Sequence, residues 1–114
     1  RLSNRLKRHR KASAFTQSEL VFLLGLKSHS AISRYEADER TPDLGTAFAY
    51  EILFEKKLGE LFPGLFADVK SQVAARAWQL ADALRKGPMN LQAAYKLERL
   101  AHLEQDGVPN LPAV

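Results

Sequence analysis

Apolar side chains recur three or four residues apart along most of the chain, which is the spacing of amphipathic helices. No long segment alternates apolar and polar residues, and β-branched residues are scarce, so no strand is predicted. Leu2 and Leu6, one turn apart with Arg10 in line, predict a first helix that ends between residues 13 and 15. The pattern therefore indicates an all-α chain.

A second helix is predicted at residues 17–24. Thr16 and Glu19 have the spacing of a capping box, in which each side chain satisfies a backbone amide of the other residue. Gly25 suits the left-handed conformation that closes a helix, because it lacks the Cβ that makes this conformation costly. The residues of this helix expected to face the core are Leu20, Leu23 and Leu24.

A third helix is predicted at residues 28–36, with Ser28 or Ser30 as its cap. Ile32 and Tyr35 lie three residues apart and would face the core, which leaves the other side of the helix outward. The side chains on that outward side are His29, Ser30, Ser33 and Arg34.

Three further segments follow. Residues 37–43 form a loop, residues 44–57 a fourth helix, and Leu58 and Leu61 a short turn-rich element that Pro63 interrupts. The residues of the fourth helix expected to face the core are Leu44, Ala47, Phe48, Ile52 and Phe54.

The composition changes after residue 65, where a long helix is predicted up to the break at Gly87 and Pro88. Asn90 can cap a last helix. The apolar stripe of the long helix consists of Val69, Val73, Leu80 and Leu84, and it is widened by Ala74, Ala75, Ala77 and Trp78. The apolar stripe of the last helix consists of Leu91, Ala94, Leu97 or Glu98, and Ala101. We therefore divide the chain into domains at 1–66 and 67–106 and a frayed tail at 107–114.

Of the 114 residues, 46% are hydrophobic and 26% are charged, which allows a core and argues against wholesale disorder. The first 40 residues hold nine Lys or Arg and four Asp or Glu, whereas the rest of the chain holds eight and nine. A basic segment of this kind is typical of a surface that meets a polyanion, since each cation at a phosphate releases condensed counterions. A solvated helix face explains the same charge.

Several kinds of site are not expected. The chain has no cysteine, which excludes disulfides and thiolate metal sites and agrees with a reducing compartment. His9, His29 and His102 have no spacing that brings two metal ligands together, and no phosphate loop, zinc-protease or nucleophile-elbow motif is present. Neither a membrane-spanning run nor a signal-peptide pattern is found. We expect a cytoplasmic protein with no catalytic residue, no metal and no cofactor.

The stretch "RKASAFTQSELVFLLGLKSHSAISRYEADERTP", residues 10–42, resembles the Cro/repressor-type (Xre) helix-turn-helix family of bacterial and phage regulators. The resemblance covers residues 1–66 and implies a five-helix lambda-repressor-like domain, here followed by two C-terminal amphipathic helices. Its marks are Arg10 seven residues before Gln17, Thr16-Gln17, Leu20, Leu24-Gly25, Ile32-Ser33, Tyr35-Glu36, and Pro42 six residues after Glu36. It implies a nucleoid-associated regulator of transcription, most simply a repressor, that binds double-stranded DNA.

The resemblance also implies roles for residues outside the third helix. Arg10 would pair with Glu36 as a sheltered strut between the first and third helices, where loss of one partner leaves an uncompensated charge. Gln17 would donate to a phosphate at the start of the second helix, although a solvated first-turn residue is the alternative. The other residues expected near the DNA backbone are Ser28, Lys27, Arg40 and Thr41.

The third helix corresponds to the recognition helix, whose first turns enter the major groove. Arg34 is the strongest candidate for base readout, because a guanidinium can bond O6 and N7 of guanine together; a contact to phosphate alone is the alternative. The remaining base-contacting candidates are His29, Ser30 and Ser33. Gly25 and Ile32 are seven residues apart, one more than is usual in the family, so the added residue either lengthens the turn or starts the helix earlier.

The C-terminal half has no resemblance of its own. Two amphipathic helices bury little unless they fold back on the first domain or meet a second copy, and a dimer would supply the two half-sites that genomic specificity needs. The residues expected at a homodimer interface are Trp78, Leu80, Leu84, Leu91, Tyr95 and Leu97, each of which could instead complete a monomer core. The alternative function is an antitoxin-like protein-interaction module with autoregulatory DNA binding.

Overall fold

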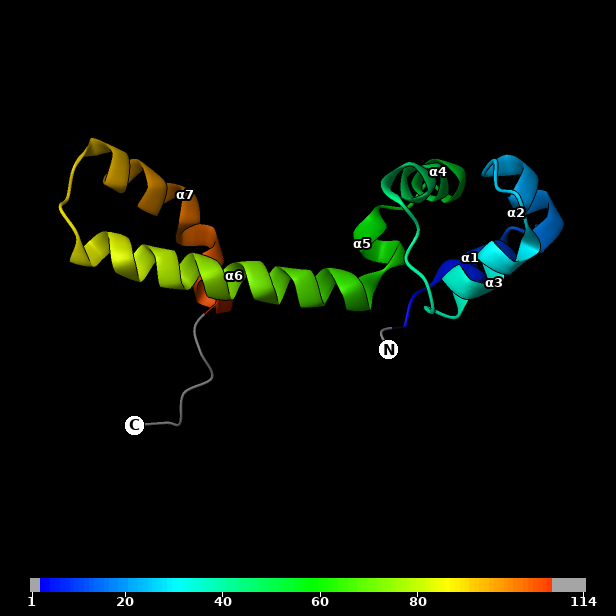
Figure 1. The fold of residues 1–114 in the computed structure, drawn as a ribbon, viewed down its shortest axis with the longest axis horizontal. Coiled ribbons are helices and arrows are strands. Elements are labelled where there is room, and N and C mark those ends of the chain that lie inside the picture. Colours follow the sequence, from blue (N-terminus) through cyan, green and yellow to red (C-terminus); the bar gives the residue numbers. More distant parts are fainter. Residues whose placement is uncertain (1–2, 108–114) are drawn as a thin grey trace. The chain divides into compact units, whose positions relative to one another are not determined.

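A computed structural model describes residues 3–107, without the side chains of residues 104–107. Regular structure in this range is entirely helical, which confirms the all-α prediction (Figure 1). The helices are α1 (Leu6–Ala12), α2 (Gln17–Leu23), α3 (His29–Glu36), α4 (Leu44–Phe54), α5 (Leu58–Leu61), α6 (Pro63–Lys86) and α7 (Leu91–Gly107). The part of the first helix predicted at Leu2 and residues 108–114 of the predicted tail lie outside the described residues, while Gly107, the first residue of that tail, ends α7.

The chain divides into two compact units, Arg1–Ala67 and Asp68–Val114. In the first unit each of the five helices contributes one fully buried side chain to a single core. These side chains are Leu6, Leu20, Ile32, Tyr50 and Leu61. Because full burial of one such side chain stabilises a fold by about 1.5–3 kcal/mol, the five together hold all five helices to one centre.

The local signals at α2 are confirmed. Thr16 Oγ1 accepts from the backbone amide of Glu19 at 3.1 Å, and the Glu19 carboxylate accepts from the amide of Thr16 at 2.9 Å, which completes the capping box. Gly25 follows with a φ of 67°, the left-handed conformation expected of it. Leu20 and Leu24 pack in or against the core, but Leu23 is 46% exposed, so its predicted inward position was wrong.

The predicted face of α4 was also wrong. Ala47 and Phe54 are buried as expected, but the rest of the buried face is formed by Thr46 and Tyr50. The predicted inward residues that are exposed instead are Leu44, Phe48 and Ile52. This helix is apolar on nearly all sides, so spacing alone does not identify the side that meets the core.

The long helix begins two residues earlier than predicted. Pro63 is its first residue and does not interrupt it, because a proline at the first helical position gives up only an amide that has no partner there. The predicted end is confirmed, since α6 ends at Lys86, directly before Gly87 and Pro88.

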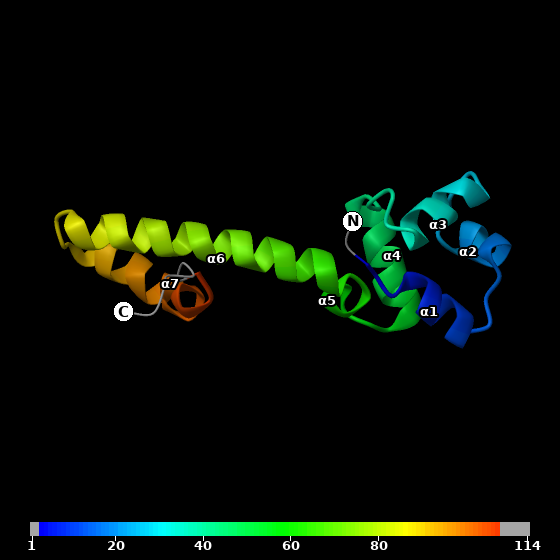
Figure 2. The same cartoon turned by 90° about the horizontal axis from the view of Figure 1, so that it is seen from below.

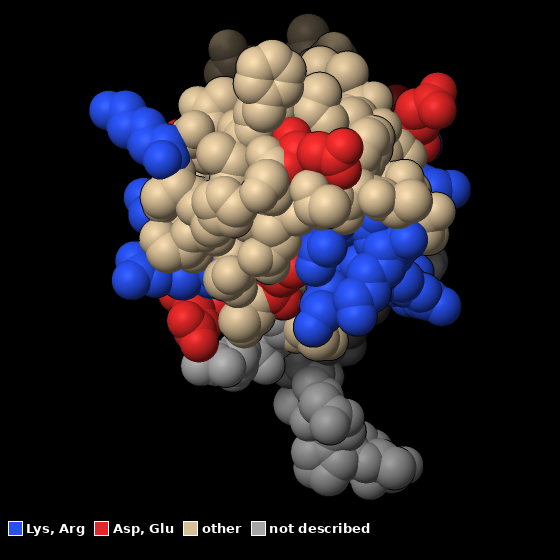
Figure 3. Space-filling model, turned by 90° about the vertical axis from the view of Figure 1, so that its right-hand side faces the viewer, with Lys and Arg blue, Asp and Glu red and all other residues tan. Residues whose placement is uncertain are grey.

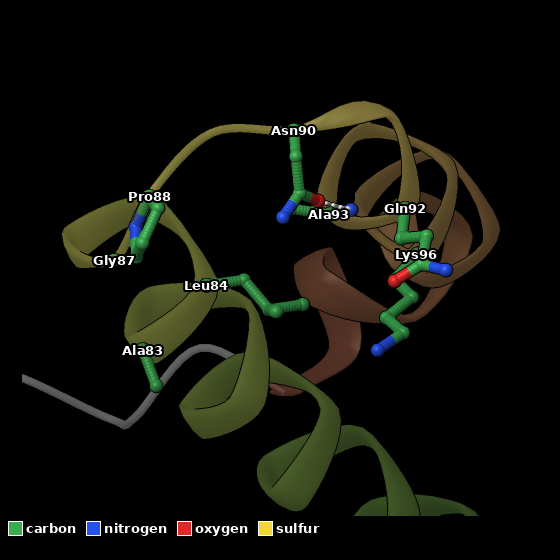
Figure 4. A pocket seen from close by; sticks show the side chains of 8 residues that line it. All are labelled: Ala83, Leu84, Gly87, Pro88, Asn90, Gln92, Ala93 and Lys96. Atoms are coloured by element: carbon green, nitrogen blue, oxygen red, sulfur yellow. Dashed lines mark hydrogen bonds between the residues drawn. The ribbon is translucent and has the colours of Figure 1, made fainter.

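The second unit consists of most of α6 and of α7, which turns back toward α6 in both views (Figure 1, Figure 2). Asn90 caps α7 as predicted, and its Oδ1 accepts from the amide of Ala93 at 2.8 Å. Figure 4 shows this turn, with the side chain of Leu84 directed into the space between the two helices. A hollow there has Leu84, Asn90 and Lys96 in its lining.

The buried residues of the second unit agree only in part with the predicted stripes, which included Ala74 and Ala77 but not Ala81 or Ala93. They are four alanines, Ala74, Ala77, Ala81 and Ala93. The predicted stripe residues found exposed in α6 are Val69, Val73, Ala75 and Leu80, and those in α7 are Leu91, Ala94 and Ala101. Close approach of two helices favours small side chains, which accounts for the buried alanines, while Trp78 and Leu84 of α6 are half-buried.

The hydroxyl of Tyr50 gives a test of the core. Its side chain is fully buried, and within the described residues the hydroxyl has no hydrogen-bond partner. Burial raises the pKa of Tyr50, because the charged phenolate would lose its hydration. Removing an unpaired buried hydroxyl costs little or is favourable.

We therefore expect Tyr50→Phe to leave the free energy of unfolding unchanged or to raise it by about 1 kcal/mol, measured by urea denaturation. Tyr50→Ala is the matched control, and it should cost about 3–5 kcal/mol through the cavity it creates. A loss of more than about 2 kcal/mol in Tyr50→Phe would show that the hydroxyl has a partner.

Candidate nucleic-acid interface

Arg10 and Glu36 form an ion pair between α1 and the last residue of α3. Arg10 Nε donates to Glu36 Oε2 at 2.6 Å and Arg10 Nη2 to Glu36 Oε1 at 3.2 Å, while Nη1 donates to the carbonyl of Phe15 at 3.2 Å. The side chains are only 12% and 5% exposed. The hydrogen bond with Glu36 raises the pKa of Arg10 further above its already high value, so the guanidinium stays charged. The structure thus brings together the two residues expected to act as a strut.

Gln17 connects this ion pair to the outward side of α3. Its Nε2 donates to Glu36 Oε1 at 3.2 Å, and its Oε1 accepts from Ser33 Oγ at 3.5 Å. The amide orientation is therefore fixed by a carboxylate on one side and a hydroxyl on the other. A side-chain amide has two N–H groups, so one remains to donate to a phosphate after the bond to Glu36 is made.

The two sides of α3 have opposite environments. Ile32 is fully buried and Tyr35 nearly so, which fixes the rotation of the helix on the core. The four side chains expected to contact bases are all exposed, and they are His29, Ser30, Ser33 and Arg34. The helix therefore presents a continuous polar face, while its apolar side holds it in place.

Hydrogen bonds order the first turn of α3. His29 Nε2 lies 3.2 Å from Ser18 Oγ of α2, and Ser28 Oγ lies 2.9 Å from Ser30 Oγ. Ser28 is the N-cap residue by its extended backbone, but its side chain bonds Ser30 and makes no capping bond. The contact with Ser18 was not foreseen, since nothing in the local sequence places α2 beside His29.

The position of the added residue follows from where α3 begins. The helix starts at His29, and Ser28 still has extended backbone, so residues 26–28 belong to the connection and not to the helix. Leu26 packs against the core, and its amide donates to the carbonyl of Val21 at 2.9 Å. The longer turn is thus anchored at Leu26, while Ile32 still reaches the core.

The residues expected near the DNA backbone lie on both sides of α3. Lys27 and Ser28 are exposed in the connection before it, and Arg40 and Thr41 are exposed in the loop after it. The amide of Arg40 donates to the carbonyl of Arg34 at 3.3 Å, which holds this loop against the end of the helix. Asp38 has a left-handed φ of 57°, a conformation that Asp tolerates better than most residues.

Lys7 is a candidate that the sequence reasoning missed. It lines a shallow pocket of about 200 Å³ between α1, α2 and α3, together with Gln17, Ser33, Glu36 and Ala37. The charge of Glu36 is balanced by Arg10, so an anion at the mouth of this pocket would meet an ammonium, an amide and a hydroxyl. Lys7 lines this pocket because α1 passes beside α3, and nothing in the sequence separates it from the other basic residues of the first helix.

Charge is unevenly distributed over the first unit. In Figure 3 much of one face is uncharged around a small acidic patch, and Lys and Arg gather mainly toward its margins, where some Asp and Glu also lie. Within the described residues, no helix is long and apolar enough to cross a bilayer, and no three acidic, His or Cys side chains are grouped so as to hold a metal ion.

The residues expected at a dimer interface all lie in the second unit and fall into two groups. Leu80, Leu91 and Tyr95 are exposed. Trp78, Leu84 and Leu97 are half-buried within the unit.

Comparison with known proteins agrees with this geometry. Residues 6–61 match the family model described as helix-turn-helix, which spans α1 to the end of α5. No curated protein matches the chain.

The strut gives a test of what holds α3. We expect Arg10→Met and Glu36→Gln each to lower the free energy of unfolding by about 3–5 kcal/mol, because each leaves a sheltered polar or charged group without its partner. The double variant Arg10→Met with Glu36→Gln should lose less than the sum of the two single losses, since no unpaired charge remains. Urea denaturation of the four proteins measures this cycle.

The exposed pair Lys86–Asp82, with 2.9 Å between Nζ and Oδ2, is the control. Asp82→Asn should change the free energy of unfolding by less than about 1 kcal/mol. If the Arg10 and Glu36 variants lose no more than this control, the pair has no structural role.

Proposed function

By the match of residues 6–61, the chain belongs to the Cro/repressor-type (Xre) helix-turn-helix family of DNA-binding regulators, and we propose that it uses α3 to bind a specific DNA sequence. In such domains the second helix of the motif enters the major groove and the first lies across the backbone. Here α3 would enter the groove, and α2 would lie above it.

One observation carries the proposal: the outward side of α3 is built from hydrogen-bonding side chains and is held rigidly. The buried side of α3 and the strut at Glu36 fix both its rotation and its end. Arg34 would bond the edge of a guanine, and His29 and Ser30, which lie nearer the start of the helix, would meet neighbouring bases. Ser33 would sit at the groove wall beside Gln17.

Contacts to phosphates would set the register of the domain on DNA. Gln17 and Lys7 would meet one phosphate at the pocket they share. Contacts from the connections on either side of α3 would come from Lys27, Ser28, Arg40 and Thr41. The regulatory action proposed is repression, since a domain bound over an operator blocks polymerase without any further activity.

The second candidate function is an antitoxin-like interaction module with autoregulatory DNA binding. Exposed apolar side chains on α4 favour it, because Leu44, Phe48 and Ile52 lie one turn apart and are 67%, 47% and 76% exposed. A row of this kind can bind another protein. Such a protein would bind DNA weakly and a protein partner tightly.

Selection of binding sites from a random DNA pool distinguishes the two. We expect a defined motif, together with salt-dependent binding to random duplex that is weaker by about 10³-fold or more. If no motif is enriched and a protein partner is captured tightly, the interaction module is the better description.

The division between base and phosphate contacts gives a further prediction. We expect Arg34→Ala to relax base preference at one position of the selected site, with a loss of about 1–3 kcal/mol on the preferred sequence only. Gln17→Ala should weaken binding to all sequences alike. Titration of both variants against the selected site and its single-base variants measures this, and equal effects on every sequence would contradict the assigned roles.

Lys7 provides a separate test of the pocket. We expect Lys7→Gln to reduce the slope of log K against log salt concentration by about 1, because one phosphate contact is lost. Lys56→Gln, at an exposed lysine of the first unit that does not line the pocket, makes the same change in charge and is the matched control. An identical slope in both variants would mean that Lys7 contributes only net charge.

A further inference from the structure

The outward side of α3 consists of two rows of side chains. His29 and Ser33 lie four residues apart in one row, and Ser30 and Arg34 lie four residues apart in the other. All four side chains are exposed. Both rows are therefore open to a ligand, and they differ in what holds their side chains.

The row of His29 and Ser33 is bonded to the first turn of α2. His29 Nε2 lies 3.2 Å from Ser18 Oγ, and Ser33 Oγ donates to Gln17 Oε1 at 3.5 Å. In the part of the chain that the structure describes, the side chain of Arg34 makes no hydrogen bond with α2. Helix α2 therefore restrains one row and leaves Arg34 in the other row free to adjust.

Ser18 contributes little to the fold by itself. It is exposed, and the cap of α2 is made by Thr16 and Glu19. Among the described residues, the hydroxyl of Ser18 has no hydrogen-bond partner other than His29. The contact therefore constrains the ring of His29 more than it holds α2.

The bond to Ser18 leaves one ring nitrogen of His29 for a ligand. A neutral imidazole has two nitrogens that can each make one hydrogen bond. Nδ1 has no partner within residues 3–107. Without Ser18 the exposed ring would be free to take other rotamers, so the contact restricts where Nδ1 is presented.

A fixed nitrogen discriminates between bases more sharply than a mobile one. Base pairs offer their donors and acceptors at set places in the major groove, so a ring held in one position bonds only the base that brings a partner there. A mobile ring can follow the partner from one base to another, and it loses freedom on binding. The contact with Ser18 should therefore affect which base is preferred.

We propose that Ser18 is a positioning residue for base readout, which holds the His29 ring so that Nδ1 meets one base pair of the site. The inference rests on the proposed function, in which α3 enters the major groove. Ser18 also lies in the first turn of α2, where its hydroxyl could instead bond a phosphate. The two roles have different consequences for binding, because only positioning of His29 affects the choice of base.

Titration of variants against the selected site and its single-base variants tests this role. His29→Ala identifies the position that His29 contacts, because base preference is lost there. We expect Ser18→Ala to reduce the preference at that same position by about threefold or more, since a hydrogen bond no longer orders the ring. Ser18→Thr keeps the hydroxyl and should retain the preference. An equal loss on every sequence would show a phosphate contact and overturn the proposal.

The double variant tests whether Ser18 acts through His29. In the His29→Ala background, Ser18→Ala should cause no further change at that position, because the ring that it orders is gone. Ser13→Ala is the matched control, since it removes an exposed hydroxyl of the first unit that makes no hydrogen bond with α3 among the described residues. Independent effects of the Ser18 and His29 substitutions would contradict the assigned role.

Nuclear magnetic resonance of the unbound protein tests the contact without DNA. We expect three-bond couplings of His29 to report one χ1 rotamer in the unaltered chain and in Ser18→Thr, and an average over rotamers in Ser18→Ala. Averaging in the unaltered chain would overturn the proposal even where a DNA motif is selected. Failure to select any motif would overturn the proposed function and the readout role with it, while the couplings would still show whether Ser18 orders the ring.

Discussion

The ion pair between Arg10 and Glu36 is the contact on which the arrangement of the first unit depends. It joins two residues 26 positions apart and fixes α1 against the end of α3. A charge this well sheltered is tolerated only when its partner is in place. The main effect of the pair is therefore to favour one arrangement of α1 and α3, and its net contribution to the free energy of unfolding is the smaller effect. Gln17 uses the same carboxylate, and Ser33 uses the amide of Gln17. The orientation of the α3 face is therefore transmitted from the interior through three polar contacts.

This constraint explains how a helix with so little core-forming material can be held rigidly. Only Ile32 and Tyr35 of α3 are buried, which is a small anchor for an eight-residue helix. The strut at Glu36 fixes one end, and the contact between Ser18 and His29 fixes the other. Side chains used for recognition can then remain exposed without loosening the helix. The longer turn before α3 is accommodated for the same reason, because Leu26 packs against the core ahead of the helix.

Signals that depend on neighbouring residues were predictable from the sequence. The capping box at Thr16, the left-handed Gly25 and the cap at Asn90 act within one turn, so spacing and residue type suffice to find them. Which side of a helix is buried depends on what lies beside it, and for α4 and α6 the sequence offers more than one apolar side. Lys7 was missed for a related reason, since its neighbours at the pocket come from helices that meet it only in the folded chain.

The error at α6 follows from a general property of helix pairs. The sequence placed Val69, Val73 and Leu80 on one apolar stripe with Ala74 and Ala77, but of these five residues only the two alanines are buried. A short hairpin brings its helices close at their contact, and small side chains permit the closest approach, so alanine takes the buried positions. Val69, Val73 and Leu80 lie on another side of the same helix, whereas Trp78 and Leu84 remain half-buried. The burial of each apolar residue of α6 therefore depends on where α7 packs, which spacing along the sequence does not show.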